Sequence, residues 1–203
     1  MTARQPRATP RAVHPIEQRS YEILRSRADT SALPPLTRAV TERVVHASAD
    51  LDYLSDLVLS PEPRLRSAAE ALASGEARLV ADVEMVAAGI TTRDAICRVR
   101  QAKSDPATGL TRSAAAIRLA YEEVGPGAVW VIGCAPTALF ELIELDVRPA
   151  LVIGLPVGFV GAAESKQALR ESGLPAVSNR SEKGGSAVAA AAANALLYPD
   201  LYA

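Results

Sequence analysis

The sequence predicts an α/β protein with three layers, α/β/α, in which helices cover both faces of a mostly parallel, Rossmann-like sheet. Two short apolar runs, 128–132 and 150–153, are each ended by a glycine and followed by a segment with helical spacing. Continuous apolar strands that alternate with helices are typical of a parallel sheet buried on both faces. Ligands of such sheets bind beyond the carboxyl ends of the strands, where the turns GCAPT (133–137) and GLPVGFVG (154–161) would lie.

Apolar patterning and helix-boundary residues predict the remaining elements. Further strands are expected at 56–59, 77–81 and 175–177, and a strand with one solvated face at 96–100. Helices are expected from Pro15 onward and at 36–47, 64–74, 112–123, 135–145, 162–173 and 187–198. Gly75 is placed to stop one of these helices, and Thr111 is placed to cap another.

Length and composition favour one domain, which we place at 14–203, after a disordered tail at 1–13 that has no apolar signal core. The 203 residues are 49% hydrophobic, with 22 Lys and Arg against 23 Asp and Glu. The net charge of −1 provides no general attraction to nucleic acid or to an acidic membrane. The Ala-rich run 187–197 is too short to span a bilayer. Two cysteines without a CxxC pair predict a reduced, cytoplasmic protein without a structural metal site.

Among titratable side chains, His46 is the main candidate for chemistry. It lies in the last turn of the helix 36–47, where the negative helix end favours the imidazolium form. A histidine beside an apolar stripe can equally be structural, and Ser20 can be a small residue at a helix contact. Asp82 and Glu84 follow a strand and are site candidates, although helix capping explains Asp82 equally well.

Two positions suggest anion binding. Arg112 falls in the first turn of a helix, where a cation is unfavourable unless an anion arrives, although a solvated surface arginine fits as well. Lys183-Gly184-Gly185 precedes the Ala-rich helix, and such a Gly-Gly pair can present backbone N–H groups to phosphate or carboxylate. Turn geometry alone would also explain the glycines.

Several common motifs are missing from the chain. Gly154, Gly158 and Gly161 have the spacing G-x3-G-x2-G, which is not the dinucleotide-binding pattern. There is no phosphate-binding P-loop, no HExxH and no G-x-S-x-G. Cys134 follows a strand, but we interpret it as a small buried thiol and not as a nucleophile.

Seven segments, which run in order from about residue 14 to 198, resemble the precorrin-8X methylmutase family, the precorrin isomerases of cobalamin biosynthesis. They are IEQRSYEI, ERVVHASAD, ADVEMVAAGI, LTRSAAAIRLA, IGCAPTALFELIE, GLPVGFVGAAESK and KGGSAVAAAAANAL. The resemblance implies that a methyl group on ring C of precorrin-8X, a tetrapyrrole, moves to the neighbouring ring carbon and gives hydrogenobyrinic acid. It implies no cofactor, no protein-bound metal and a homodimer with the ligand near the subunit boundary. In the anaerobic version the substrate already holds cobalt.

The resemblance also implies roles for individual residues. The family's histidine matches His46, which would protonate or hydrogen-bond a ring nitrogen of the substrate. The substrate's carboxylates would be bound by residues at the remaining matched positions. These residues are Ser20, Thr91, Thr92, Arg93, Arg112, Lys183, Gly184 and Gly185.

Two positions depart from the family pattern. Cys134 stands where the family commonly has an asparagine that would contact substrate, and Ala49 stands where glycine is usual, which matters if φ is positive there. Two rival interpretations belong to other functional classes. One is a tetrapyrrole carrier without turnover, and the other is a nucleotide-binding regulator suggested only by the glycine-rich turns.

Overall fold

The computed structural model describes residues 14–198, so the predicted tail at 1–13 lies outside the described residues. The elements alternate along the chain and confirm the predicted α/β class. In order they are α1 (Pro15–Arg27), α2 (Pro35–Ser48), α3 (Tyr53–Asp56), β1 (Leu57–Leu59), α4 (Glu62–Ser74), β2 (Leu79–Ala81), α5 (Glu84–Gly89), α6 (Arg112–Val124), β3 (Val129–Ile132), α7 (Pro136–Glu144), β4 (Leu151–Gly154), α8 (Ala162–Glu171), β5 (Ala176–Asn179) and α9 (Ser186–Leu197).

The strands form one sheet with the order β1-β5-β4-β3-β2. The pairs β2–β3, β3–β4 and β4–β5 are parallel, whereas the edge strand β1 runs antiparallel to β5. The turns after β2, β3, β4 and β5 therefore lie along one edge of the sheet, and the chain also enters β1 from this edge. We call this the carboxyl edge.

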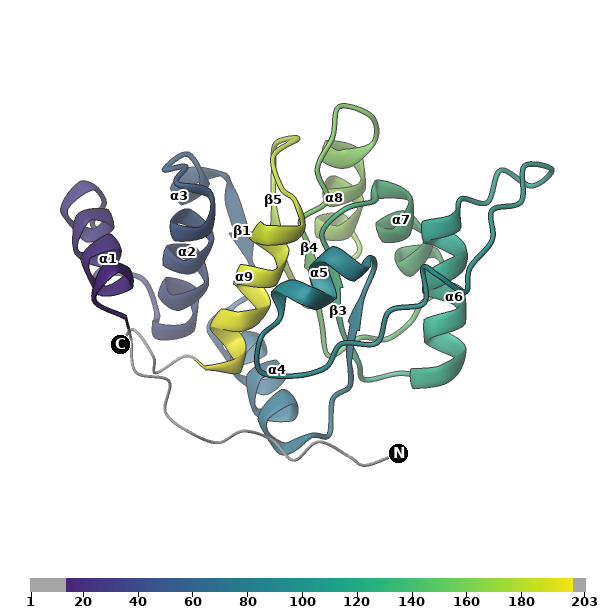
Figure 1. The fold of residues 1–203 in the computed structure, drawn as a ribbon, viewed down its shortest axis with the longest axis horizontal. Helices are drawn as coiled ribbons and strands as arrows, with labels where there is room; N and C mark the ends of the chain where they lie inside the picture. Colours follow the sequence, from purple (N-terminus) through teal and green to yellow (C-terminus); the bar gives the residue numbers. More distant parts are fainter. Residues whose placement is uncertain (1–13, 199–203) are drawn as a thin grey trace.

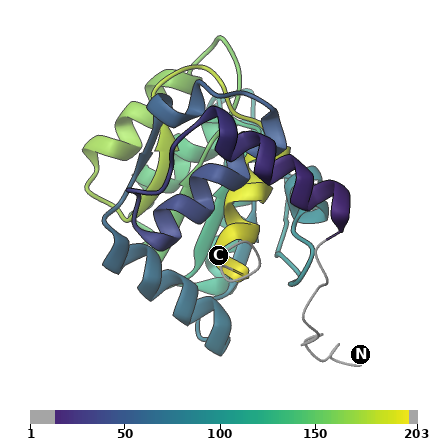
Figure 2. The same cartoon turned by 90° about the vertical axis from the view of Figure 1, so that its left-hand side faces the viewer.

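Both faces of the sheet are covered by helices (Figure 1). Successive residues of a strand point to opposite faces, so Val129 and Val131 join one core cluster while Trp130 and Ile132 join the other. The first cluster contains apolar residues of α2, α4, α5 and α9, and the second contains those of α6, α7 and α8. Helix α1 packs outside α2, at one end of the molecule (Figures 1 and 2).

The alanines of α9 allow unusually close packing beneath the carboxyl edge. All residues from Val188 to Leu196 are buried, and α9 packs mainly against α2 and α5. A Cβ atom at Gly133, just after β3, would lie 2.8 Å from both Ala189 Cβ and Val86 Cγ2. The absence of a side chain at Gly133 therefore lets α5 and α9 approach the end of β3.

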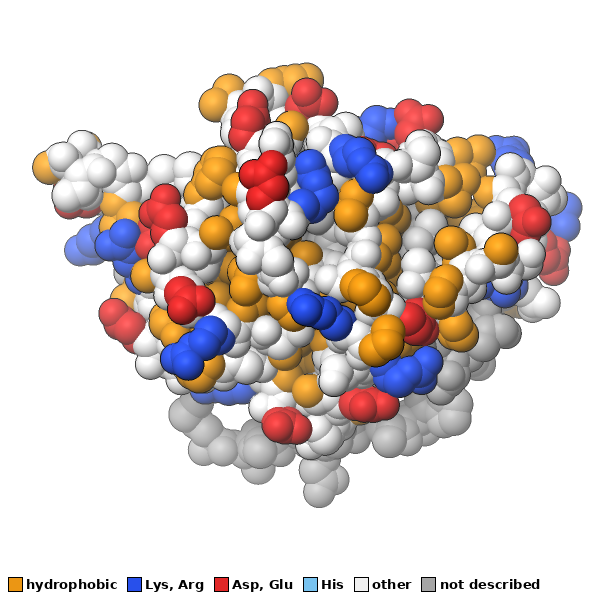
Figure 3. Space-filling view, turned by 180° about the vertical axis from the view of Figure 1, so that it is seen from behind, with side chains coloured by type: hydrophobic (Ala, Val, Ile, Leu, Met, Phe, Trp, Pro, Cys, Tyr) orange, Lys and Arg blue, Asp and Glu red, His pale blue; other side chains and the backbone are white. Residues whose placement is uncertain are grey.

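One loop of the carboxyl edge is apolar and exposed. The segment between β4 and α8 projects from the molecule, with its tip at the top of the view (Figures 1 and 3). Phe159 is 97% exposed and Val160 is 89% exposed. Exposure of this extent for two large apolar neighbours marks a surface that is available for contact with another molecule.

Two predicted helix ends are confirmed, and one predicted strand is wrong. Gly75 ends α4 in a left-handed conformation, with φ of 82°, and the side chain of Thr111 accepts a hydrogen bond from the Ala114 N–H at the start of α6. At 96–100, only Ile96 forms a β-bridge, with Val80. The chain then turns, because the amides of residues 101 and 102 donate to the carbonyl of Arg98. The alternation of Arg98 and Arg100 with apolar residues reflects this turn and surface ion pairs, not a strand.

No helix within residues 14–198 combines the length and the apolar character needed to cross a membrane.

Candidate functional site

His46, in the last turn of α2, is contacted by two residues of α1. The Oγ atom of Ser20 is 2.9 Å from His46 Nδ1. The ring of Tyr21 stacks on the imidazole, with ring centroids 4.9 Å apart and an interplanar angle of 12°. One ring nitrogen therefore has a fixed partner and one ring face is covered. The rotation of the imidazole is restricted before any ligand binds.

The electrostatics of His46 are opposite to the prediction from its place in α2. Burial and the nearby positive charge of Arg43 lower the pKa of His46, and only Glu17 acts in the other direction. The expected stabilisation of the imidazolium by the helix end is therefore outweighed by desolvation and by a cation one turn earlier. In this chain the neutral imidazole is the favoured form at neutral pH.

A buried carboxylate joins α2 to the chain around α1. Glu42 is 1% exposed and accepts charge-assisted hydrogen bonds from Arg25 and Arg38, with a further bond from Thr30. Burial alone would raise the pKa of Glu42, but these hydrogen bonds lower it. Breaking a buried pair of this kind leaves an uncompensated charge. The Glu42 contacts thus hold α1 in the position that brings Ser20 to His46.

The loop between β5 and α9 reaches the segment that follows α2. Lys183 Nζ lies 2.7 Å from Asp50 Oδ2 and 2.6 Å from Asp52 Oδ2. Gly184 has φ of 158°, and a Cβ atom there would lie 2.3 Å from the carbonyl oxygen of Leu155, so only glycine fits. The Gly185 N–H donates to that same carbonyl over 2.9 Å. The Gly185 N–H therefore already has an acceptor within the protein.

Asp82, at the end of β2, holds the turn between β3 and α7. Its two carboxylate oxygens accept the N–H groups of Gly133, Cys134 and Ala135 over 2.8–3.1 Å. Asp82 is fully buried, and desolvation raises its pKa despite these three hydrogen bonds. The three amides precede the first turn of α7, and neither α5 nor α7 begins with a side-chain cap, so helix capping does not explain Asp82.

Cys134 lies in this turn. The prediction of a buried thiol is wrong, because Cys134 is exposed at the carboxyl edge. Its backbone N–H donates to Asp82 over 2.8 Å, which fixes the backbone at this position. Desolvation of the sulfur and the Asp82 carboxylate raise the pKa of the thiol, which makes it a poor nucleophile.

The Thr91–Arg93 group lies at the other end of α9. The Thr91 N–H donates to Asn194 Oδ1 over 3.2 Å, and its hydroxyl lies 3.4 Å from that of Tyr198. Arg93 donates to the carbonyl of Ala73, at the end of α4, and Thr92 is exposed. A helix as long as α9 spans about 18 Å, and that length separates this group from Lys183.

Arg112 lies in the first turn of α6, with its side chain exposed. No carboxylate within residues 14–198 lies within ion-pair distance of it. Helix α6 and helix α1 are at opposite ends of the long axis of the molecule (Figure 1), and α1 lies in front when the molecule is turned by 90° (Figure 2). One copy of the chain therefore brings Ser20 and His46 together but keeps Arg112 away from them.

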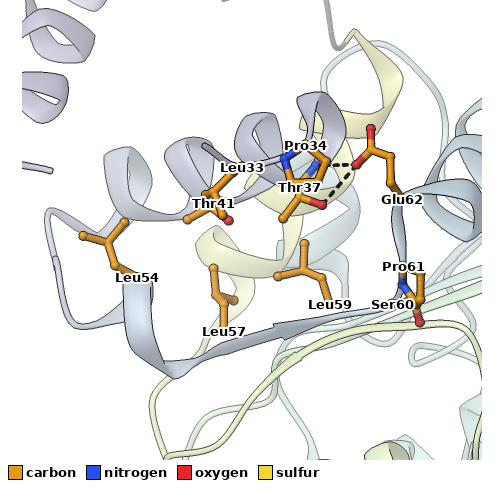
Figure 4. Close-up of a pocket in the computed structure, with 10 residues that line it drawn as sticks. All are labelled: Leu33, Pro34, Thr37, Thr41, Leu54, Leu57, Leu59, Ser60, Pro61 and Glu62. Atoms are coloured by element: carbon orange, nitrogen blue, oxygen red, sulfur yellow. Dashed lines mark hydrogen bonds between the residues drawn. The ribbon is translucent and has the colours of Figure 1, made fainter. Parts of the chain in front are cut away.

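A hollow between α2 and the edge strand β1 is separate from all of these residues (Figure 4). Leucines from α3 and β1 line it together with Thr37 and Thr41 of α2, and Glu62 closes one end by accepting hydrogen bonds from Thr37. None of the predicted site residues lines this hollow, so we assign it no part in the chemistry.

The sequence interpretation missed three residues that organise the carboxyl edge, namely Lys166, Asn179 and Asp56. Lys166 is fully buried, although it is a lysine. A signal was present, since Lys166 follows Ala162 by four residues and precedes Leu169 by three, which places it on the buried face of α8. A charged residue in an apolar stripe indicates a buried partner.

The chain was compared with known protein families, with curated proteins and with solved structures. The family model of precorrin-8X methylmutase matches residues 15–199. A precorrin-8X methylmutase from Sinorhizobium sp is 41% identical over 201 residues, covering 92% of this chain and 94% of the relative. A cobalt-precorrin-8 methylmutase from Salmonella typhimurium is 40% identical over 198 residues, covering 90% and 93%. The crystal structure of precorrin-8X methylmutase from Thermus thermophilus superposes with a TM-score of 0.78 at 33% identity, covering 90% of this chain and 93% of that one.

The fold and these relatives define an α/β isomerase that catalyses methyl migration in cobalamin biosynthesis. More specifically, the chain belongs to the precorrin-8X methylmutase family. The predicted family and the predicted class of enzyme are thereby confirmed.

Proposed function

We propose that this chain moves the ring C methyl group of precorrin-8X to the neighbouring ring carbon, giving hydrogenobyrinic acid. The observation that carries the proposal is the Ser20–His46 contact, formed by the family's histidine in a chain that is about 40% identical to methylmutases over nine-tenths of its length. The reaction is intramolecular, so the protein must shape the macrocycle and make it a better electron acceptor for the migrating methyl group.

In our proposal, His46 makes the macrocycle a better electron acceptor for the migrating methyl group. With the Ser20 hydroxyl donating to Nδ1, the ring proton is on Nε2, which is then a hydrogen-bond donor for a ring nitrogen of the substrate. Carboxylates brought by the substrate favour the imidazolium and so promote full proton donation. General acid assistance contributes about 10²- to 10⁴-fold to a rate.

The substrate's side-chain carboxylates require donors, which we assign to the carboxyl edge and to α9. Lys183, Gly184 and the position of Cys134 are on this edge. Thr91, Thr92 and the guanidinium N–H groups of Arg93 not bound to Ala73 would serve at the far end of α9. Charge-assisted hydrogen bonds of this kind fix orientation, and orientation aligns the two ring carbons.

We further propose a homodimer in which Arg112 of one copy completes the pocket of the other. Arg112 is exposed, forms no ion pair within the part of the chain described, and lies at the opposite end of the molecule from His46. The exposed apolar tip formed by Phe159 and Val160 offers surface for the second copy. A propionate or acetate of the substrate would neutralise Arg112 at the positive end of α6.

The same proposal covers the finer points of architecture and location. The parallel pairs β2–β3, β3–β4 and β4–β5, with helices on both faces, support a doubly wound, Rossmann-like arrangement within one domain at 14–203. Two cysteines without a bonded partner support a reduced, cytoplasmic location.

A visible-absorption assay tests the function. Purified protein and its His46→Ala variant are each incubated with metal-free precorrin-8X and, separately, with cobalt-precorrin-8. We expect the wild type to convert the metal-free substrate and the variant to lose at least about 100-fold in rate. Conversion of the cobalt form alone would place the chain in the anaerobic route. Binding of product without conversion of either form would favour a carrier, and equal rates for both proteins would refute the role of His46.

A further inference from the structure

Lys166, on α8, is a buried cation for which the proposed function has not yet accounted. Its side chain is 0% exposed. Its Nζ atom donates to Asn179 Oδ1 over 2.9 Å, to the carbonyl of Lys183 over 2.7 Å and to the carbonyl of Ser181. An ammonium group has three donors and no acceptor. The three acceptors therefore satisfy it completely, and two of them belong to the loop between β5 and α9.

Asn179 links this ammonium to a carboxylate on another element. Asn179 Nδ2 donates to Asp56 Oδ2 over 2.7 Å and to the carbonyl of Lys183 over 2.9 Å. The other oxygen of Asp56 accepts the backbone N–H groups of Arg180 and Ser181, both over 2.9 Å. A buried charge is tolerated when it is paired and its hydrogen bonds are complete. Lys166 and Asp56 thus hold the same loop from two sides.

The three acceptors require the charged form of Lys166. Burial lowers its pKa to about 8, Asp56 and Glu182 act to raise the pKa, and Arg170 acts to lower it. At neutral pH the group is still mainly protonated. A neutral amine would have only two N–H donors and would leave one buried acceptor unsatisfied, which is costly.

The inward carbonyls determine where the loop's N–H groups point. In a trans peptide the C=O and the following N–H point in opposite directions, and no peptide bond among the described residues is cis. Because the carbonyls of Ser181 and Lys183 point at Lys166, the N–H groups of Glu182 and Gly184 point away from the buried side. Gly184 is the residue that packs against Leu155 and tolerates no side chain.

We propose that Lys166 is a positioning residue for substrate binding. Lys166 lies on the buried side of the loop, where it fixes the direction of the Gly184 N–H and the backbone path at Lys183. The proposed function assigns both of these residues to a carboxylate of the substrate. Lys166 itself does not touch the substrate. This inference rests on the proposed function and adds to it the residue that holds the carboxylate-binding segment in shape.

The test compares Lys166→Met with Lys103→Met, which changes an exposed lysine in the loop before α6. Methionine keeps the length of the buried side chain but cannot donate. We expect Lys166→Met to raise KM for precorrin-8X, and Kd for hydrogenobyrinic acid, about tenfold, with kcat changed less than about threefold. Lys103→Met should leave all three constants unchanged. Asn179→Ala, which removes the one side-chain acceptor of Lys166, should raise KM about threefold and provides the test if Lys166→Met does not fold.

The outcomes separate this inference from the function on which it rests. A folded Lys166→Met protein with unchanged KM and Kd, or one in which only kcat falls, would overturn the positioning role while leaving the methylmutase activity of the wild type intact. If Lys166→Met does not fold, an unchanged KM in Asn179→Ala would overturn it. A wild-type protein that neither converts precorrin-8X or its cobalt form nor binds the product would overturn the proposed function, and the role of Lys166 with it.

Discussion

Ser20 Oγ lies 2.9 Å from His46 Nδ1, across the contact between α1 and α2. The contact joins residues 26 positions apart, and Tyr21, the next residue of α1, stacks on the same imidazole. Helix α1 therefore contacts the imidazole at one ring nitrogen and on one ring face, and the ion pair between Arg25 and Glu42 ties α1 to α2. The orientation of the proposed acid depends on how two helices pack, not on the local sequence around the histidine.

Ser20→Ala tests this arrangement. Loss of the hydroxyl removes the hydrogen bond that holds the imidazole at Nδ1, and a hydrogen bond of this kind contributes about 0.5–1.5 kcal/mol. We expect kcat to fall about 3- to 10-fold with KM changed less than twofold. Ser26→Ala is the matched control, because Ser26 is an exposed serine of the same helix that bonds only to the carbonyl of Ile23. Equal kcat values for the two variants would contradict the role of Ser20.

The lowered pKa of His46 predicts a dependence of stability on pH. Because the folded-state pKa is below the usual 6.5, the unfolded chain binds more protons between the two values. The contribution of His46 to the free energy of unfolding is complete above pH 6.5 and is lost as the pH falls through the folded-state pKa. Urea unfolding of wild type and His46→Gln from pH 8 to pH 5 measures this contribution. The difference in the free energy of unfolding between the two proteins should be constant near pH 8. At lower pH the wild type should lose stability relative to the variant. A constant difference throughout would show that the pKa is unchanged by folding.

Ala49 predicts a stabilising substitution. It follows α2 with φ of 54°, in the left-handed region, where an alanine costs about 1–2 kcal/mol and a glycine does not. Glycine adds entropy to the unfolded chain, which offsets about half of this gain. Ala49→Gly should therefore raise the free energy of unfolding by about 0.5–1 kcal/mol, measured as an increase in Tm of about 1–4 °C.

The control for Ala49 is Ala47→Gly, two residues earlier. Ala47 is exposed within the last turn of α2, where a glycine should lower the free energy of unfolding by about 0.5–1 kcal/mol. If both substitutions lower Tm, the left-handed conformation at Ala49 carries no cost.

The shared pocket of the proposed homodimer can be tested by mixing variants. If Arg112 serves the partner's pocket, His46→Ala and Arg112→Ala should each have low activity when expressed alone. A two-fold dimer that contains one copy of each variant has one intact pocket. Random co-assembly should then restore about a quarter of the wild-type activity per chain. Mixing without any recovery would place Arg112 in the same pocket as the His46 of its own chain, and full activity of Arg112→Ala alone would place it outside both pockets.

Local patterns in the sequence predicted most of the fold. The apolar runs that end at Gly133 and Gly154 are β3 and β4, and Thr111 caps α6 as expected. The turn at Arg98 was not predictable from alternation, because an ion pair with Glu123, on α6, holds its side chain. Local patterns describe neighbours along one element, whereas these contacts join elements that are far apart in the sequence.

The candidate site was predictable only in part for the same reason. His46 and Ser20 were named from their segments, but their contact depends on helix packing. The direction of the His46 pKa depends on burial and on Arg43, and helix position alone predicts the wrong sign. The spacing of Lys166 indicates that it is buried, but its contact with Asn179 forms only when the chain has folded.

Asp82 makes the carboxyl edge uneven in the N–H groups that it offers to anions. Its two oxygens already bind three successive amides of the turn after β3. Helices α7, α8 and α9 begin along the same edge without a side-chain cap, and the first turn of a helix attracts negative charge. A substrate that lies on this edge, as we propose, would meet occupied amides at one place and uncapped helix ends at others. Rotations of a nearly fourfold-symmetric macrocycle would then differ in energy, and a reaction at a single one of four rings depends on that difference.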